Sequence, residues 1–223
     1  MSTAKISMTY YLDIMSSWCT YVDPLWDELQ QSYAGRVNFD WKIALMNREA
    51  FPVSAKQCAW FYTRSKCMQP EVPQLTPGWF EADRRGDYEA PHLVAEAGRD
   101  LGMADDRLRR ALAHAALQEG QKVGDLDNSV TIAAELFNLD PNTLRTAATS
   151  DSVRQRIAAS TAEFHAHQLT QRPAFIITSS IGDKAVFSGV INRETLVNTL
   201  DSMLTDHQGY QSFSDQFGPM PTD

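Results

Sequence analysis

The chemistry open to this chain is limited most by Ser16 and Cys19, which stand where an alternating strand pattern gives way to a helical one. Their spacing is that of a redox dithiol, whose sulfur atoms are three residues apart, but the first of the two atoms here is an oxygen. Disulfide exchange needs an exposed thiolate that attacks and a second thiol that resolves the mixed disulfide. Because Ser16 and Cys19 cannot form a disulfide, ordinary dithiol exchange through this motif is excluded.

The hydroxyl of Ser16 can serve a different reaction from the same position. It precedes a helical pattern, so it would lie at the positive end of a helix beside backbone N–H groups that have no partner. Such groups stabilise an anion, and a bound thiolate is one. A hydroxyl there can donate a hydrogen bond to the sulfur of a bound thiol and keep it ionised. Alternatively, Ser16 only caps the helix, a contribution of roughly 1 kcal/mol; the two roles are compatible.

The other two cysteines, Cys58 and Cys67, lie in an aromatic, proline-rich stretch. They could form an auxiliary dithiol, although two independent buried cysteines are the simpler interpretation. The aromatic residues of this stretch could roof an apolar pocket over Ser16 or close a core; they are Trp60, Phe61, Tyr62 and Trp79. The histidines lack the spacing of metal ligands, so we expect no metal site.

The hydrophobic pattern predicts an α/β fold with a long helical interruption. The segments with the pattern of an α/β unit are strands at 6–13, 37–45, 174–178 and 184–187 and helices at 18–32 and 193–204. The first strand–helix–strand unit predicts two parallel strands. A short helix is expected near 54–67, and helical patterns then continue from 91 to 167.

Three structural units follow from this order of elements. Residues 1–46 and 169–206 would form one discontinuous α/β domain, and residues 47–168 a helical insertion domain. Residues 207–223 are polar with Gly and Pro, and they are expected to form a loose C-terminal tail.

The composition excludes several partners. A chain with 43% apolar and 22% charged residues can bury a core without cross-links. The net charge of −8 argues against nucleic acid, which needs a basic face. No apolar run approaches the roughly 20 residues that span a bilayer, so no membrane partner is expected. The N-terminus lacks the apolar core of a signal peptide, and the number of cysteines is odd; both favour a reduced, cytoplasmic location.

Four local patterns, taken in order, have a counterpart in a known group of proteins. They are Asp13-Ile14-Met15-Ser16-Ser17-Trp18-Cys19, Leu117-Gln118-Glu119-Gly120 through Leu126, Arg172-Pro173-Ala174-Phe175 and Phe187-Ser188-Gly189-Val190-Ile191-Asn192-Arg193-Glu194. The chain thereby resembles the DsbA-like branch of the thioredoxin superfamily, and most of all the group of FrnE-type oxidoreductases, 2-hydroxychromene-2-carboxylate isomerases and kappa-class glutathione transferases. This resemblance implies a thioredoxin-like fold with a large all-helical insertion.

The resemblance also implies roles for individual residues. Pro173 would follow a cis peptide bond, which leaves the backbone of Arg172 free to pair with the cysteinyl part of glutathione. The Arg172 side chain would meet a ligand carboxylate or face solvent. Ser17 and Trp18 would contact the substrate. Asn192 lies where kappa transferases hold the γ-glutamyl group with a Ser-Asp pair, from which this chain departs.

Three functions remain open on this basis. The first is a glutathione-dependent transferase or isomerase with Ser16 and Cys19 as catalytic residues, acting on a small molecule or a thiol. The second is a redox-inactive binding or chaperone module of thioredoxin fold. The third is a thiol oxidoreductase that works through Cys19 alone, or through Cys58 and Cys67. Related proteins are often dimers, so a homodimer is one expectation.

Overall fold

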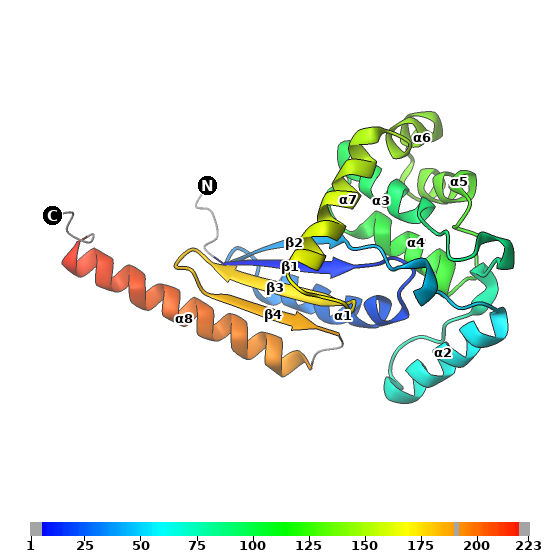
Figure 1. The fold of residues 1–223 in the computed structure, drawn as a ribbon. Coiled ribbons are helices and arrows are strands. Elements are labelled where there is room, and N and C mark those ends of the chain that lie inside the picture. Colours follow the sequence, from blue (N-terminus) through cyan, green and yellow to red (C-terminus); the bar gives the residue numbers. More distant parts are fainter. Residues whose placement is uncertain (1–5, 190–191, 219–223) are drawn as a thin grey trace.

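A four-stranded mixed sheet forms the centre of the molecule (Figure 1). Its strands are β1 (Ile6–Leu12), β2 (Val37–Ile43), β3 (Ala174–Ser179) and β4 (Lys184–Ser188), in the order β2-β1-β3-β4. β1 runs parallel to β2 and antiparallel to β3, and β4 is antiparallel to β3. The computed structural model describes residues 6–189 and 192–218. The predicted α/β architecture with an all-helical insertion is confirmed.

The two faces of the sheet are covered by different helices because successive side chains of a strand point to opposite faces. Tyr10 points toward α1 (Ser17–Ser32), where its ring centroid lies 5.2 Å from that of Trp26. Leu196 and Leu200 of α8 (Arg193–Phe217) belong to the same core. The neighbouring Tyr11 points the other way, toward Phe164 of α7 (Asp151–Ala166).

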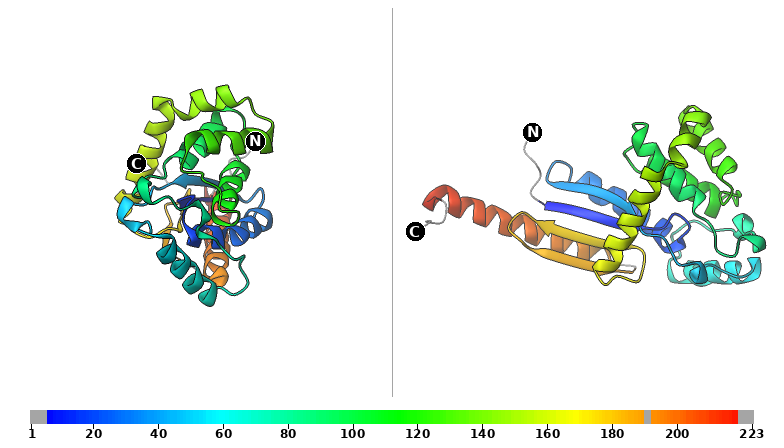
Figure 2. Two further views of the ribbon diagram at one scale, coloured as in Figure 1. Left: turned by 90° about the vertical axis from the view of Figure 1, so that its right-hand side faces the viewer. Right: turned by 45° about the horizontal axis from the view of Figure 1, so that its top comes forward.

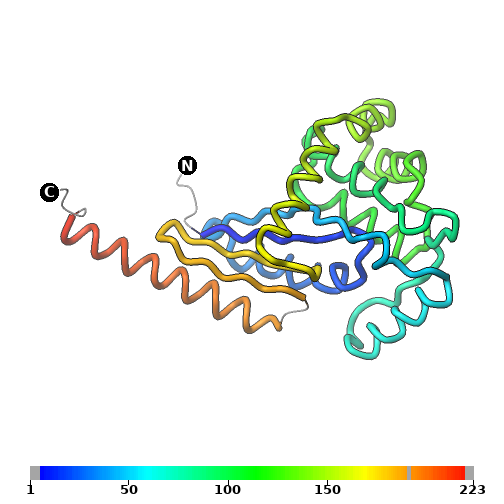
Figure 3. Tube along the Cα trace, viewed as in Figure 1, coloured from blue at the N-terminus to red at the C-terminus, as the bar shows by residue number. Residues whose placement is uncertain are grey.

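The helical insertion gathers at one end of the sheet (Figures 2 and 3). Its elements are η1 (Arg48–Ala50), α2 (Ala55–Met68), η2 (Pro77–Trp79), η3 (Ala82–Arg84), α3 (Ala90–Asp100), α4 (Arg107–Leu117), α5 (Leu126–Phe137), α6 (Pro141–Ala148) and α7 (Asp151–Ala166). Every residue of α3 from Ala90 to Gly98 is buried, so α3 is the central helix of the insertion. The division into domains at residues 46 and 168 stays an interpretation.

α1 is fixed to the helical insertion by a buried charge cluster. The two terminal nitrogens of Arg109, on α4, donate to Asp23 of α1 at 2.9 Å and to Asp106 at 2.8 Å. All three side chains are almost fully buried. Since a buried charge is tolerated only when it is paired and hydrogen-bonded, this cluster sets the orientation of α1 relative to the insertion.

The predicted tail is the main error in the sequence-based description of the fold. α8 does not end near Leu204 but continues to Phe217, well past the edge of the sheet (Figure 1). Its last turns are exposed and carry Tyr210, Phe213 and Phe217 at helical spacing, with the last two rings in contact at 4.9 Å. Gly209 just before these aromatics and the polar residues between them hid the helical period from sequence reasoning. Of the fourth motif, Val190 and Ile191 lie outside the described residues.

Candidate functional site

The site forms where β1 ends and α1 begins. Ser16 is the N-cap of α1: its backbone is extended, and its Oγ accepts a hydrogen bond from the amide of Cys19 at 3.4 Å. Among the described residues, the amide N–H groups of Ser17 and Trp18 have no acceptor. The helix start therefore presents a hydroxyl and two unbonded amides, which together favour an anion.

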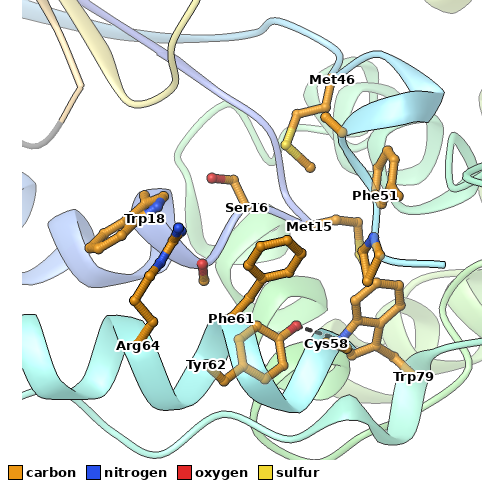
Figure 4. Close-up of a pocket in the computed structure, with 13 residues that line it drawn as sticks. Met15, Ser16, Trp18, Met46, Phe51, Cys58, Phe61, Tyr62, Arg64 and Trp79 are labelled. Carbon is orange, nitrogen blue, oxygen red and sulfur yellow. Dashed lines mark hydrogen bonds between the residues drawn. The ribbon is translucent and has the colours of Figure 1, made fainter. Parts of the chain in front are cut away.

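A pocket of about 150 Å³ opens beside Ser16 (Figure 4). The hydroxyl-bearing residue is only 6% exposed, and this pocket is its route to solvent. One wall of the pocket is formed by the end of the β1–α1 turn and the start of α1, with Met15, Ser16, Ser17 and Trp18. The opposite wall is formed by α2. A cavity of roughly this volume accommodates one benzene-sized group. The pocket can therefore hold an apolar ring next to a hydroxyl but not a whole tripeptide.

Aromatic side chains make the inner end of this pocket rigid. The indole N–H of Trp79 donates to the hydroxyl of Tyr62 at 2.7 Å, and Tyr62 is hydrogen-bonded in turn to the thiol of Cys58. Trp79 is held by a close approach of two loops, because a Cβ on Gly78 would lie 2.8 Å from the Cα of Gly120. The expected aromatic roof therefore exists, with Phe61, Tyr62 and Trp79 in the pocket lining. Trp60 is not part of it and is 59% exposed.

Arg64 brings a positive charge to the same pocket. Its guanidinium rises from α2 toward Trp18 and lies 6.0 Å from that ring centroid and 5.3 Å from the ring of Phe61 (Figure 4). In the part of the chain that the structure describes, Arg64 forms neither an ion pair nor a hydrogen bond. Its charge therefore remains available for an anionic group that enters the pocket.

The cysteines are poorly placed for redox chemistry. Cys19 is buried, and burial raises the pKa of its thiol to about 11, although a hydrogen bond with Ser16 opposes this shift. Burial likewise raises the pKa of Cys58. Cys67 is exposed, so the expectation of a second buried cysteine is wrong for it. Nine residues along one helix separate the Cα atoms of Cys58 and Cys67 by roughly 13 Å, beyond the reach of a disulfide.

A buried acid–imidazole pair supports the β1–α1 turn from below. Asp13 Oδ1 lies 3.0 Å from His92 Nε2, and each side chain is 1% exposed. The two carboxylate oxygens of Asp13 also accept the amides of Met15 and Met46, both at 2.8 Å. Burial acts to raise the pKa of Asp13, but its contact with His92 and these hydrogen bonds outweigh it and lower the pKa. Asp13 thus connects the turn before Ser16 to the chain leaving β2.

Four of the predicted site residues do not line this pocket: the buried Cys19, and Arg172, Pro173 and Asn192. The Arg172–Pro173 peptide bond is cis and lies beside the end of β1, since Tyr11 pairs with Ala174. The guanidinium of Arg172 donates to the carbonyls of Ala44 at 2.7 Å and Leu45 at 2.6 Å, so it is used within the protein. Asn192 caps α8 by accepting the amide of Glu194 and lines a separate groove along α1.

Sequence reasoning missed several residues of the site. His92 and Arg64 lie on helices without any motif, and only the fold brings them to the β1–α1 turn. Met46 and Phe51, also in the lining, follow β2 in a stretch without regular periodicity. No group of three or more His, Cys, Asp and Glu side chains within residues 6–189 and 192–218 is placed to hold a metal ion. No helix in those residues is long and apolar enough to cross a membrane.

Comparison with known proteins identifies the fold. The chain is similar to solved structures of a candidate protein disulfide isomerase from Nitrosomonas europaea (TM-score 0.70, 17% identity, 91% of this chain and 99% of that chain covered) and of DsbA from Pseudomonas aeruginosa (0.61, 12%, 95% and 88%). DsbA from Xylella fastidiosa is similar as well (0.60, 15%, 93% and 88%). No curated protein matches. Residues 8–201 match the family model of the DSBA-like thioredoxin domain, and the chain belongs to that family.

Proposed function

We propose that this protein is a glutathione-dependent transferase or isomerase of the DSBA-like family, with Ser16 as the residue that holds the thiolate. The observation that carries this proposal is the Ser16 hydroxyl, which faces an apolar pocket beside the unbonded amides of Ser17 and Trp18. A thiolate at this position would receive hydrogen bonds from all three groups. These bonds favour the ionised form of the sulfur and lower the pKa of the bound thiol.

Because the pocket is small, glutathione and the second substrate would bind in two different places. Only the sulfur of glutathione fits beside Ser16, and the tripeptide would extend outside the pocket, toward the end of β1 where Pro173 begins β3. The apolar group of the second substrate would occupy the space between Met15 and the rings of Phe61 and Trp79. Arg64 would bind a carboxylate of either ligand at the pocket wall.

The chemistry demands little beyond ionisation and orientation. Glutathione loses its thiol proton to solvent, and the thiolate attacks an electrophilic carbon. A C–S bond forms, and the leaving group departs with the electron pair of the bond that breaks. In an isomerisation, the thiolate adds to a conjugated double bond and the electron pair moves to the conjugated carbonyl oxygen. Rotation about the new single bond follows, and return of the pair expels the thiolate.

The oxidoreductase alternative receives less support from the site. Ser16 cannot be oxidised to a disulfide, and the high pKa of the buried Cys19 leaves almost no thiolate at neutral pH. The three cysteines are all free thiols, as is usual where glutathione keeps proteins reduced. We therefore place the proposed activity in the cytoplasm.

Thermal stabilisation by glutathione and by S-hexylglutathione tests the proposal. Millimolar glutathione should raise the melting temperature of the wild-type protein, and Ser16→Ala should abolish the shift. Ser150→Ala is the matched control, because Ser150 caps α7 with a similar bond, to the amide of Val153 at 3.3 Å, far from the pocket. The absence of any shift in the wild-type protein would instead favour a binding module that does not use glutathione.

A further inference from the structure

His92 connects the helical insertion directly to the backbone that carries Ser16. It lies on α3, 78 residues away from Ile14 in the sequence, and its Nε2 lies 3.0 Å from the Ile14 amide nitrogen. Its other ring nitrogen, Nδ1, lies 3.0 Å from the carbonyl oxygen of Tyr88. A carbonyl can only accept, so Nδ1 carries a proton and donates it, which fixes the ring.

Three consecutive amides before α1 thereby have fixed partners. The amide of Ile14 donates to His92, that of Met15 to the Asp13 carboxylate, and that of Ser16 to the Asp13 carbonyl at 3.1 Å. All of these partners are buried. The next two amides, of Ser17 and Trp18, are the ones left unbonded at the pocket. The direction of these two N–H groups therefore depends on the three amides before them.

We propose that His92 is a positioning residue for the Ser16 site. Through Ile14 and Asp13 it holds the β1–α1 turn so that the amides at the start of α1 point at whatever atom occupies the pocket beside residue 16. The helical insertion would then contribute to the chemistry through one buried contact as well as through the pocket wall. This inference does not depend on which thiol binds.

A thiol introduced at position 16 reports on this arrangement without any ligand. In a Ser16→Cys, Cys67→Ser background that is fully reduced beforehand and kept free of oxygen, the rate of alkylation at position 16 is measured against pH, and the modified site is identified by mass spectrometry. Cys19 contributes little, because its pKa of about 11 keeps it protonated. The amides of a well-placed helix start should hold the pKa of the introduced thiol well below the ordinary value for cysteine.

Substitutions of His92 test whether its hydrogen bond with the Ile14 amide positions the turn. His92→Leu removes the contact and should raise the pKa of the introduced thiol by about one unit, a tenfold loss of thiolate below that pKa. His92→Gln has a side-chain amide whose oxygen reaches the Nε2 position and accepts from the Ile14 amide. It should restore the low pKa, whereas the shorter His92→Asn should not.

Leu93→Ala is the matched control for general destabilisation, since Leu93 is the buried neighbour of His92 on the same helix. It should lower the melting temperature and leave the thiol pKa unchanged. The proposal is overturned if His92→Leu leaves the thiol pKa unchanged, or if Leu93→Ala shifts it equally. It is also overturned if His92→Gln behaves like His92→Leu, because the hydrogen bond that the Ile14 amide donates would then not be what sets the thiol pKa. Should His92→Leu fail to fold, the comparison of His92→Gln with His92→Asn decides. Failure to bind glutathione would affect none of these results.

Discussion

The Ser16 hydroxyl accepts a hydrogen bond from the amide of Cys19 at 3.4 Å, so the two positions of the dithiol motif are in contact across the first turn of α1. Cys19 is buried directly behind the cap. The fold therefore keeps the geometry of a redox motif while one oxygen atom removes the reaction.

The first prediction is that a single substitution restores that reaction. Ser16→Cys should form a disulfide with Cys19 when oxidised, because residues i and i+3 at a helix start are close enough for one. Its disulfide reductase activity, measured by insulin reduction, should also rise above that of the wild-type protein. Ser17→Cys places a thiol next to the motif at the wrong spacing and should remain inactive. Equal activity of the two variants would show that the motif geometry is not responsible.

The second prediction concerns the three native thiols. At pH 8, iodoacetamide should modify the exposed Cys67 within minutes and leave Cys19 and Cys58 almost unmodified, because both are buried and burial raises both pKa values. Peptide mass spectrometry measures the three sites separately. In denaturant all three should react alike, which shows that the fold provides the protection. Rapid modification of Cys19 in the native protein would reopen a role for its thiolate.

The third prediction tests Arg64 as an anion-binding residue. Because a charge-assisted hydrogen bond contributes about 1.5–3 kcal/mol, Arg64→Gln should weaken glutathione or an anionic second substrate by roughly tenfold or more. Lys56→Gln removes the same charge from the same helix outside the pocket lining and should change affinity little. Isothermal titration calorimetry measures both. Repeating the titration with a glutathione ester shows which ligand supplies the carboxylate. If Arg64 binds a carboxylate of glutathione, Arg64→Gln should no longer change the affinity for the ester.

The sequence predicted those features that depend on residues close together in the chain, and it missed those that depend on residues far apart in the chain. The β1–α1–β2 unit was predictable because period-two and helical patterns are local, and the family motifs placed Ser16 at the start of the helix. His92 and Arg172 were not, because their partners lie 78 and more than 120 residues away in the chain. A histidine beside apolar residues and an arginine before a proline give no local signal of such contacts. Arg64 was missed for the opposite reason, since an unpaired arginine resembles any solvent-exposed charge.

The fourth prediction concerns stability in acid. The pKa of Asp13 is lower in the folded protein than its ordinary value of 3.8, so between these two values the unfolded chain binds more protons. The contribution of Asp13 is therefore complete above about pH 5 and is lost as the pH falls through the folded-state pKa. Asp13→Asn should reduce the free energy of unfolding at pH 7 by about 2–3 kcal/mol and flatten its dependence on pH below 5. Urea unfolding between pH 3 and 7 measures both effects, and the exposed Asp83→Asn should change neither.

The last prediction is that the Arg172 side chain stabilises the fold and does not bind the ligand. Its guanidinium donates to the carbonyls of Ala44 and Leu45 and lies 4.2 Å from the centroid of the Phe164 ring, in a partly buried position. Arg172→Met keeps the aliphatic stem but leaves both carbonyls without a donor. The free energy of unfolding should fall by about 2 kcal/mol. Arg36→Met is a matched surface control, because Arg36 also donates to a carbonyl and lies over a ring, but in an exposed position where the loss should be under about 1 kcal/mol.

If the shift produced by glutathione survives in Arg172→Met once its lower melting temperature is taken as the baseline, the side chain does not bind the ligand. Loss of the shift at unchanged stability would return Arg172 to the binding site.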